Sequence, residues 1–165
     1  MRACGPQLLN LVRTYGVPEG EAEDVAQDAF VAAWRALGDY DPARPFRAWL
    51  FHIGLNKARD WRRKRRVRSF FFGAAALDEP EALAVETGEP DPESAAHDRR
   101  RLARVRAAVA RLPDETRDVF VLTTAGGLTY AEAGEALGLS VKAVEGRLLR
   151  ARRQLQADLA DIARE

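Results

Sequence analysis

The sequence has little of what metal-dependent, secreted or membrane proteins use. Its single cysteine, Cys4, excludes an internal disulfide, and its two histidines stand far apart with no CxxC pair, so it offers no zinc-ligand set. No apolar run approaches the about 18 residues of a membrane-spanning helix, and the N-terminus lacks the basic-then-apolar build of a signal peptide. We therefore expect a cytoplasmic protein with no metal, no cofactor and no membrane insertion.

Charge is distributed in blocks, although the net charge is only +1. Residues 47–68 contain nine Lys or Arg and one acid, Asp60, whereas residues 69–98 contain eight acids and no Lys or Arg. So much like charge in one segment repels itself unless a polyanion neutralises it, and this favours nucleic acid as a partner. The basic, acidic, basic order predicts two DNA-facing parts separated by a linker.

Residues 45–66, PFRAWLFHIGLNKARDWRRKRR, are expected to form one continuous helix with two distinct faces. One face is an apolar stripe roughly 140° wide, which is typical of a helix packed on a core. The other is a polar and cationic band, which is either an ordinary solvated face or a nucleic-acid surface; the clustering of charge favours nucleic acid. The stripe contains Phe46, Trp49, Leu50, Ile53, Gly54 and Trp61, and the band contains His52, Asn56, Arg59 and Arg63.

Residues 19–37 are predicted to form a second amphipathic helix, which Gly38 ends. Acids crowd its first turns, where they interact favourably with the helix dipole. Opposite its alanine-rich stripe, carboxylates surround Val31, and Trp34 lies at the flank. This face is either an ordinary solvated surface or a docking surface for a basic partner. The stripe contains Ala22, Val25, Ala26, Ala29, Ala33, Ala36 and Leu37.

Shorter segments surround these two helices. An apolar run before Gly16 is predicted to be the end of a further helix. Residues 39–45 form a proline-stiffened loop, in which Tyr40 either packs locally or stacks on a base. The three adjacent phenylalanines 70–72 are expected to cap the core of the first domain rather than insert into a partner. Residues 69–98 have the composition of an extended, flexible acidic linker.

Helical periodicity returns near residue 99, and the last two predicted helices form a helix-turn-helix. Thr129 and Glu132 make a capping box at the start of the first helix, and residues 138–140 supply the turn. A second helix with an outward basic face fits the major groove, although similar helix pairs occur in proteins that never contact DNA. Gly146 lies in the middle of this helix, where a glycine lowers helix stability by about 1 kcal/mol. A close approach of the helix backbone to DNA would explain why a glycine is found there. Apolar positions recur at Leu102, Val105, Val109 and Leu112, at Val119, Phe120 and Leu122, and, as a buried stripe, at Val141, Val144, Leu148, Ala151 and Leu155.

Three stretches occur in a distinctive order: AEDVAQDAFVAAWRAL, FRAWLFHIGLNKARDWRRKRR and LTYAEAGEALGLSVKAVEGRLLRARRQL. Together they closely resemble the extracytoplasmic-function group of the bacterial sigma-70 family, over roughly residues 19–68 and 99–158. The resemblance implies an all-α protein of two small domains, sigma domain 2 at 1–68 and sigma domain 4 at 99–165, joined by the acidic linker 69–98. It also implies that the protein is not an enzyme but the promoter-specificity subunit of RNA polymerase.

The resemblance further implies three sets of binding residues and one more partner. The first set meets the clamp of the largest polymerase subunit, the second recognises the −10 element and the third reads the −35 element. An anti-sigma factor usually restrains such proteins. The core-polymerase set is Asp24, Gln27, Asp28, Phe30, Val31 and Trp34; the −10 set is Tyr40, His52, Asn56, Arg59, Arg62 and Arg63; the −35 set is Lys142, Ala143, Gly146, Arg147, Arg150 and Arg153.

The sequence departs from the family pattern at three places. Family members normally have a longer helix before Asp24, so we expect a shortened first helix here. Gly54 replaces a usual alanine in the packing stripe. Glu145 and Gly146 replace a frequent Lys-Ser pair in the recognition helix. Because a carboxylate repels phosphate or accepts from a cytosine amino group, we expect an unusual −35 preference.

The main alternative function is a helix-turn-helix regulator that acts without core polymerase. It fails to explain why the acidic face of residues 24–34 and the basic helix of residues 56–66 occur together. A nucleic-acid enzyme would need a metal-ligand cluster or a nucleophile with a base, and the sequence shows neither. Whether the two domains fold on each other in the free protein is a question that the sequence leaves open.

Overall fold

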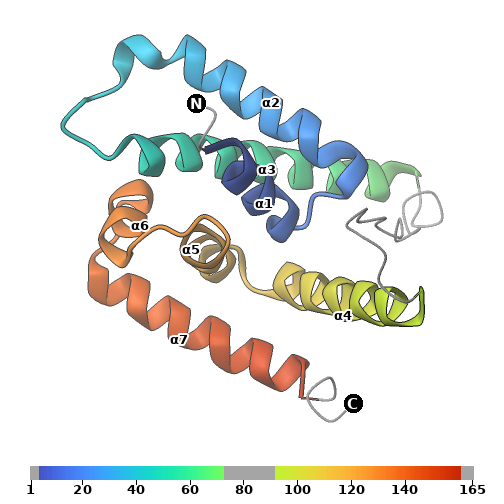
Figure 1. Cartoon of the computed structure of the whole chain (residues 1–165). Coiled ribbons are helices and arrows are strands. Elements are labelled where there is room, and N and C mark those ends of the chain that lie inside the picture. Colours follow the sequence, from blue (N-terminus) through green and yellow to red (C-terminus); the bar gives the residue numbers. More distant parts are fainter. Residues whose placement is uncertain (1–3, 73–91, 161–165) are drawn as a thin grey trace.

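The computed structural model describes residues 4–72 and 92–160, and within these ranges every regular element is a helix, as predicted. The helices form two groups, α1–α3 and α4–α7, that lie one above the other (Figure 1). None of the described helices is long and apolar enough to cross a membrane. The elements are α1 (Gly5–Tyr15), α2 (Glu19–Arg35), the 3-10 helix η2 (Leu37–Asp39), α3 (Phe46–Phe72), α4 (Pro92–Arg111), α5 (Asp114–Thr124), α6 (Tyr130–Leu137) and α7 (Val141–Asp158).

Helix α1 is short and mostly apolar, and it packs against both α2 and α3. It ends where the sequence predicted, because Gly16 adopts the left-handed conformation (φ 110°) that a side chain disfavours. Its Leu8 is fully buried and lies against α3 at Gly54. A Cβ at Gly54 would collide with the Leu8 side chain, which explains why glycine replaces alanine there.

Helix α2 ends at Arg35, two residues earlier than predicted, and the chain continues into η2. Leu37 therefore leaves the predicted stripe and is 45% exposed. The rest of the stripe, from Ala22 to Ala33, is buried as expected. Small alanine side chains let α2 approach α3 closely, so the outward face of α2 is held on a rigid support.

Helix α3 continues to Phe72, beyond the predicted end at residue 66. Phe70 is 85% exposed, so the prediction that it caps the core is wrong; the side chains of residues 71–72 lie outside the described part. The predicted stripe is buried at Leu50 and Gly54 and half-buried at its aromatic positions. A second face is also buried, because α3 is covered by α1 and α2 on one side and by α5 and α6 on the other. The buried residues that the predicted stripe omitted are Ala48, Phe51, Leu55 and Ala58.

The helix-turn-helix of α6 and α7 has the predicted caps. The Thr129 Oγ1 accepts from the Glu132 amide at 3.2 Å, and the Glu132 Oε2 accepts from the Thr129 amide at 2.8 Å. Gly138 (φ 66°) makes the left-handed turn, and Ser140 caps α7 by accepting from the Ala143 amide at 3.2 Å. The buried stripe of α7 is as predicted except for Val141, which is 45% exposed.

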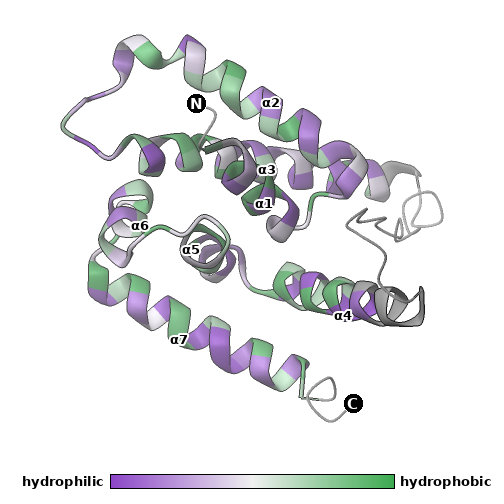
Figure 2. Ribbon diagram, in the orientation of Figure 1, coloured by the Kyte–Doolittle hydropathy of each residue, from purple (hydrophilic) through white to green (hydrophobic). Residues whose placement is uncertain are grey.

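The two helix groups share one continuous apolar core. Helix α3 contacts α5 and α6, and α1 contacts α4 and α5. The hydrophobic and hydrophilic residues of α7 alternate along its length, as expected for a helix covered on one side only (Figure 2). Helices α3 and α4 both extend into residues 69–98, the segment predicted to be the linker. Residues 73–91 of that segment lie outside the described residues.

Candidate polymerase and promoter surfaces

The outward face of α2 combines acids with exposed apolar side chains. Asp24, Gln27 and Asp28 are exposed, Val31 is 47% exposed and Trp34 is 68% exposed. Phe30, the remaining member of the predicted core-polymerase set, is half-buried and packs on the apolar core. An exposed tryptophan beside carboxylates is an unusual surface for a free protein and suits a partner that is both apolar and basic.

On α3, the polar band forms a chain of hydrogen bonds. The Asn56 amide lies 3.0 Å from the His52 ring, and its Oδ1 accepts from the Arg59 Nη1 at 2.8 Å. The Arg59 Nε donates to Asp118 of α5 at 3.3 Å, and its Nη2 forms an ion pair with the other oxygen of the same carboxylate. The band therefore ends on a carboxylate of the C-terminal helix group. No local pattern in the sequence points to Asp118, since its role depends on a helix that is distant in the chain.

Burial and the Asp118 charge set the protonation of this chain. Burial disfavours the charged Arg59 guanidinium, but the hydrogen bond and charge of Asp118 outweigh it and raise the pKa of Arg59. Burial, aided by the nearby Arg59 charge, lowers the pKa of His52, although the Ala136 backbone and Asp118 act in the opposite direction. His52 is therefore neutral near pH 7 and contributes hydrogen-bonding capacity, not charge, to the band.

The two other arginines of the predicted −10 set differ in their surroundings. The Arg62 Nη2 donates to the Ala110 carbonyl at 2.9 Å, at the end of α4. Arg63 is largely exposed and forms an ion pair with Asp60 of its own helix at 3.0 Å. Arginines along this side of α3 line an open groove of about 220 Å³, together with Tyr15 of α1 and Asp114 of α5. Its lining includes Arg59, Arg62, Arg63 and Arg66, so the groove is cationic and borders both helix groups.

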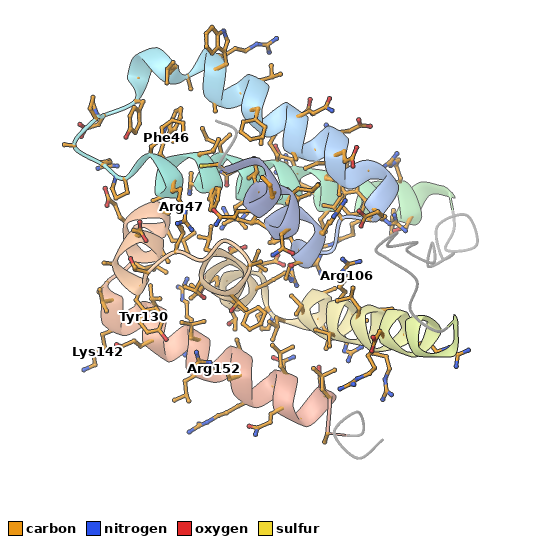
Figure 3. All side chains as sticks on the ribbon, viewed as in Figure 1. Phe46, Arg47, Arg106, Tyr130, Lys142 and Arg152 are labelled. Carbon is orange, nitrogen blue, oxygen red and sulfur yellow. The ribbon has the colours of Figure 1, made fainter. Side chains whose placement is uncertain are left out.

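Arg47 is a binding residue that the sequence analysis missed. Its Nη2 donates to the Gly126 carbonyl at 2.6 Å and to the Gly127 carbonyl at 3.0 Å. Figure 3 shows it between α3 and the C-terminal helices. An arginine in a basic helix carries no sign of an internal partner, so only the fold identifies this role.

Tyr40 packs on the first turn of α3. Its ring contacts Phe46 and Trp49 at centroid distances of 5.5 and 4.9 Å, and its hydroxyl donates to the Arg44 carbonyl at 2.6 Å. Of the two alternatives, local packing or stacking on a base, this structure has the packed one. Tyr40 is nevertheless only half-buried.

The outward face of α7 is open, in contrast to the band on α3. Lys142, Gly146, Arg150 and Arg153 are exposed, and Ala143 is half-buried. Lys142 extends away from the rest of the molecule (Figure 3). Arg147 is the exception among the predicted readers, because its Nη2 forms an ion pair with Glu115 of α5 at 2.8 Å.

The three predicted residue sets lie in different places. The core-polymerase set is on the outer side of α2 and the −35 set on the outer side of α7, at opposite ends of the stacked groups (Figure 1). Two members of the −10 set lie between the groups, Arg59 against α5 and Arg62 against α4. Among the described residues, no three His, Cys, Asp or Glu side chains gather in a group that would hold a metal ion.

Family models match both helix groups. The model of Sigma-70 region 2 matches residues 1–68, and the model of Sigma-70 region 4 matches residues 102–155. The RNA polymerase sigma factor CnrH of Cupriavidus metallidurans is 53% identical over 93% of this chain and 81% of its own length. The RNA polymerase sigma factor NccH of Alcaligenes xylosoxydans xylosoxydans is 44% identical over the same shares of the two chains.

Two solved structures are also similar. The structure of CnrH in complex with the cytosolic domain of CnrY has a TM-score of 0.72 and 43% identity, over 97% of this chain and 84% of that one. The structure of the sigma factor RpoE with the anti-sigma factor NepR from Bartonella quintana has a TM-score of 0.72 and 23% identity, over 96% and 93%. At that identity the second match supports the fold alone.

Proposed function

The chain belongs to the extracytoplasmic-function group of RNA polymerase sigma factors of the sigma-70 family, and we propose that three of its helix surfaces divide the work of promoter recognition. As a sigma factor, it serves transcription initiation and is not an enzyme. Residues 1–68 act as sigma domain 2 and residues 99–165 as sigma domain 4, with residues 69–98 connecting them. The protein works in the cytoplasm, where polymerase and promoter DNA meet.

The face of α2 is the proposed contact with the clamp of the largest polymerase subunit. The observation that carries this assignment is Trp34, which is 68% exposed on a helix whose opposite side is fixed by buried alanines. Binding hot spots are typically tryptophan, tyrosine or arginine side chains held rigidly in contact with a partner. Asp24, Gln27 and Asp28 supply the polar rim, and Phe30 supports the face from beneath.

The band on α3 is the proposed surface for the −10 element. Asn56 presents an amide, which reads base edges, and Arg59, Arg62 and Arg63 present cations for the backbone. His52 and Tyr40 support this band, His52 through its contact with Asn56 and Tyr40 by packing on the first turn of α3. Flipping a base out of the duplex costs a few kcal/mol, which the contacts to the opened strand offset.

The outward face of α7 is the proposed reader of the −35 element. Ser140 fixes the start of the helix, and Lys142, Arg150 and Arg153 project from it into open space. Arg147 serves this surface only after its ion pair with Glu115 is exchanged for a phosphate. Ala143 and Gly146 are small, which lets the helix backbone approach the groove.

An anti-sigma factor is a further proposed partner of this chain. Both similar solved structures are sigma factors in complexes, one with the cytosolic domain of CnrY and one with the anti-sigma factor NepR. The match to the CnrH complex extends over 97% of this chain and therefore over both helix groups. A partner that holds both groups together would keep the sigma factor away from promoters.

Run-off transcription tests the proposal. Purified core polymerase is mixed with genomic DNA fragments with and without the protein, and new transcript starts are sequenced. We expect protein-dependent starts that share spaced −35 and −10 motifs. DNA binding without core polymerase and without new starts would instead favour a helix-turn-helix regulator.

The same assay separates the surfaces when it is combined with pull-down on core polymerase. Trp34→Ala should lose core binding at least about thirtyfold, as expected for a hot-spot side chain. Leu149→Ala is the matched control, since Leu149 is 51% exposed but lies on α7, on the other side of the molecule. Equal loss of core binding in both variants would contradict the assignment of α2.

A further inference from the structure

Two of the residues proposed to bind the −10 element, Arg59 and Arg62, also join the two helix groups. Arg59 binds Asp118 through two of its nitrogens, and Arg62 donates to the Ala110 carbonyl at 2.9 Å. About three turns earlier on α3, Arg47, which is not in the −10 set, donates to the carbonyl of Gly126 at 2.6 Å. In this arrangement the side chains that would meet the opened DNA strand already have partners within the same chain.

The groups that bind these arginines within the chain are oxygen acceptors, like those that DNA would present. Arginine binds carboxylate and phosphate with the same planar fork of N–H donors, and backbone carbonyls resemble the oxygens of bases and sugars as acceptors. Asp118 presents both of its oxygens to Arg59, as a phosphate would present two of its oxygens. A single carboxylate therefore makes with Arg59 the two-oxygen contact that a phosphate would make.

Asp118 is buried at this contact with Arg59. Its side chain is 6% exposed, and aspartate is almost never so buried unless it is paired. Among the described residues, its ion-pair partner is Arg59 of the other domain, whereas its neighbour Arg117 pairs with Asp114.

Apolar contacts accompany the ion pair across the same interface. Phe51 of α3 is fully buried, and its ring lies where a Cβ on Gly126 would come within 3.1 Å of it. The guanidinium of Arg117 lies over the Tyr15 ring at 5.3 Å from its centroid. The interface is thus packed closely enough to exclude DNA from the covered part of α3.

We propose that the free protein is held closed by an internal latch, in which Asp118 occupies Arg59 in place of a DNA phosphate and must be released before the −10 element binds. This inference rests on the proposed function of the α3 band. The −35 face of α7 stays open in the closed form, so the closed protein can contact the −35 element but not the −10 element. The apparent affinity for the −10 strand is reduced by the fraction of molecules that are closed.

The first experiment measures closure directly, without DNA. Donor and acceptor dyes are attached at Lys64→Cys on α3 and Arg152→Cys on α7, two exposed positions, in a Cys4→Ser background of the full chain. Asp118→Asn keeps the shape of the side chain and removes its charge, so it should lower the energy-transfer efficiency. Glu115→Gln is the matched control: it removes one acid from the same helix, but Glu115 pairs with Arg147 inside its own domain.

The second experiment measures binding of a fluorescent single-stranded oligonucleotide that carries the −10 sequence obtained from run-off transcription. Asp118→Asn should bind it about five- to tenfold more tightly at low salt, as expected when one charge-assisted contact no longer competes. Glu115→Gln should change the affinity less than about twofold.

The outcomes separate the latch from the proposed function. Unchanged energy transfer and unchanged oligonucleotide binding in a folded Asp118→Asn variant would overturn the latch, even if core-dependent transcription is normal. Domain opening without tighter oligonucleotide binding would instead refute the −10 assignment of α3, on which the inference depends. If Asp118→Asn does not fold, the charge swap Arg59→Asp with Asp118→Arg decides, because a latch predicts that it restores energy transfer while Arg59→Asp alone abolishes it.

Discussion

Two helix faces of this protein have the same chemistry in different surroundings. The band on α3 and the outward face of α7 are both rich in arginine and lysine. On α3, Arg59 is 36% exposed and ends on a buried carboxylate, whereas Lys142 and Arg150 on α7 are open to solvent. The difference shows that cationic side chains alone do not define a free nucleic-acid surface, because what lies opposite them decides whether they are available.

The comparison also explains how the chain tolerates a segment with a charge of +8 between residues 47 and 68. Part of that charge is neutralised internally, by Asp118 on Arg59 and by Glu21 on Arg65. Helix α7 spreads its cations along an exposed face, where water and salt screen them. A basic segment therefore indicates that anionic groups are needed to neutralise it. The fold determines whether these groups come from the same chain or from a partner.

The largest expected difference between the two faces is the loss of stability when one arginine on each face is replaced by alanine. Arg59→Ala leaves the Asp118 carboxylate buried and unpaired, so we expect the free energy of unfolding to fall by about 2 kcal/mol. This is below the range for a fully buried pair because Arg59 itself is about one-third exposed. Arg150→Ala should change it by less than about 0.5 kcal/mol. Urea unfolding followed by circular dichroism measures both.

The control for this pair is the double variant Arg59→Ala with Asp118→Asn. Removing the partner charge should recover part of the lost stability, because no unpaired buried carboxylate remains. Equal losses in Arg59→Ala and Arg150→Ala would mean that the two faces are alike and that the closed arrangement contributes no stability.

Asn56→Ala should give the next largest effect, on −10 use. It removes the amide that meets His52 and holds the Arg59 Nη1 at 2.8 Å, so both base reading and the orientation of Arg59 suffer. We expect about tenfold fewer open complexes on a promoter identified by run-off transcription, with core binding unchanged. Permanganate footprinting measures opening, and pull-down measures core binding.

Asn10→Ala is the matched control, because the Asn10 amide on α1 donates to the Ala125 carbonyl at 3.3 Å and lies outside the band. It should leave promoter opening within about twofold of the wild type. A loss of core binding in Asn56→Ala would show that this residue serves polymerase and not DNA.

Local chemistry made the helix-turn-helix predictable from the sequence. The Thr129 and Glu132 capping box and the turn at Gly138 each depend on residues within a few positions, and all three occur as predicted. The exposed face of α2 was also identified correctly, since Val31 and Trp34 lie opposite a stripe of alanines. Patterns with a helical period identify such faces wherever one side of a helix is covered.

The inner face of α3 could not be predicted, because it is covered by a domain that is distant in the sequence. Phe51, Leu55 and Ala58 are buried on it, although a single-stripe pattern places them outside the core. The pairing of Asp118 could not be predicted either, because a lone aspartate in a helix is normally expected to be exposed to solvent. Phe70 failed for the opposite reason: α3 continues outward, so an apolar residue there is exposed.

On α7, Gly146→Ala should raise the stability of the protein and lower its affinity for the −35 element. A Cβ at Gly146 would meet no atom within 4 Å, so the helix should gain up to about 1 kcal/mol. If the backbone approaches the −35 groove closely there, affinity for a −35 duplex should fall by about threefold to tenfold. Thermal melting and fluorescence anisotropy measure the two effects.

Gly134→Ala provides the contrast within the same helix-turn-helix. A Cβ there would come within 2.6 Å of the Leu139 carbonyl oxygen, so this variant should lower the melting temperature. If Gly146→Ala melted lower as well, the space around position 146 would be filled by the protein and the DNA explanation of this glycine would fail.

Salt dependence should give the smallest effect and the finest distinction between the two faces. On α7, Lys142→Ala removes one phosphate contact, so the slope of log affinity against log salt for a −35 duplex should become shallower by about 1, with the preferred sequence unchanged. On α3, salt weakens both the DNA contacts and the Arg59 to Asp118 pair that competes with them, so the two effects partly cancel. Binding of the −10 strand should therefore depend less on salt than its arginines suggest, and Asp118→Asn should steepen that slope while Lys142→Ala leaves it unchanged. Equal slopes in the wild type and Asp118→Asn would show that no internal charge competes with DNA for the α3 face.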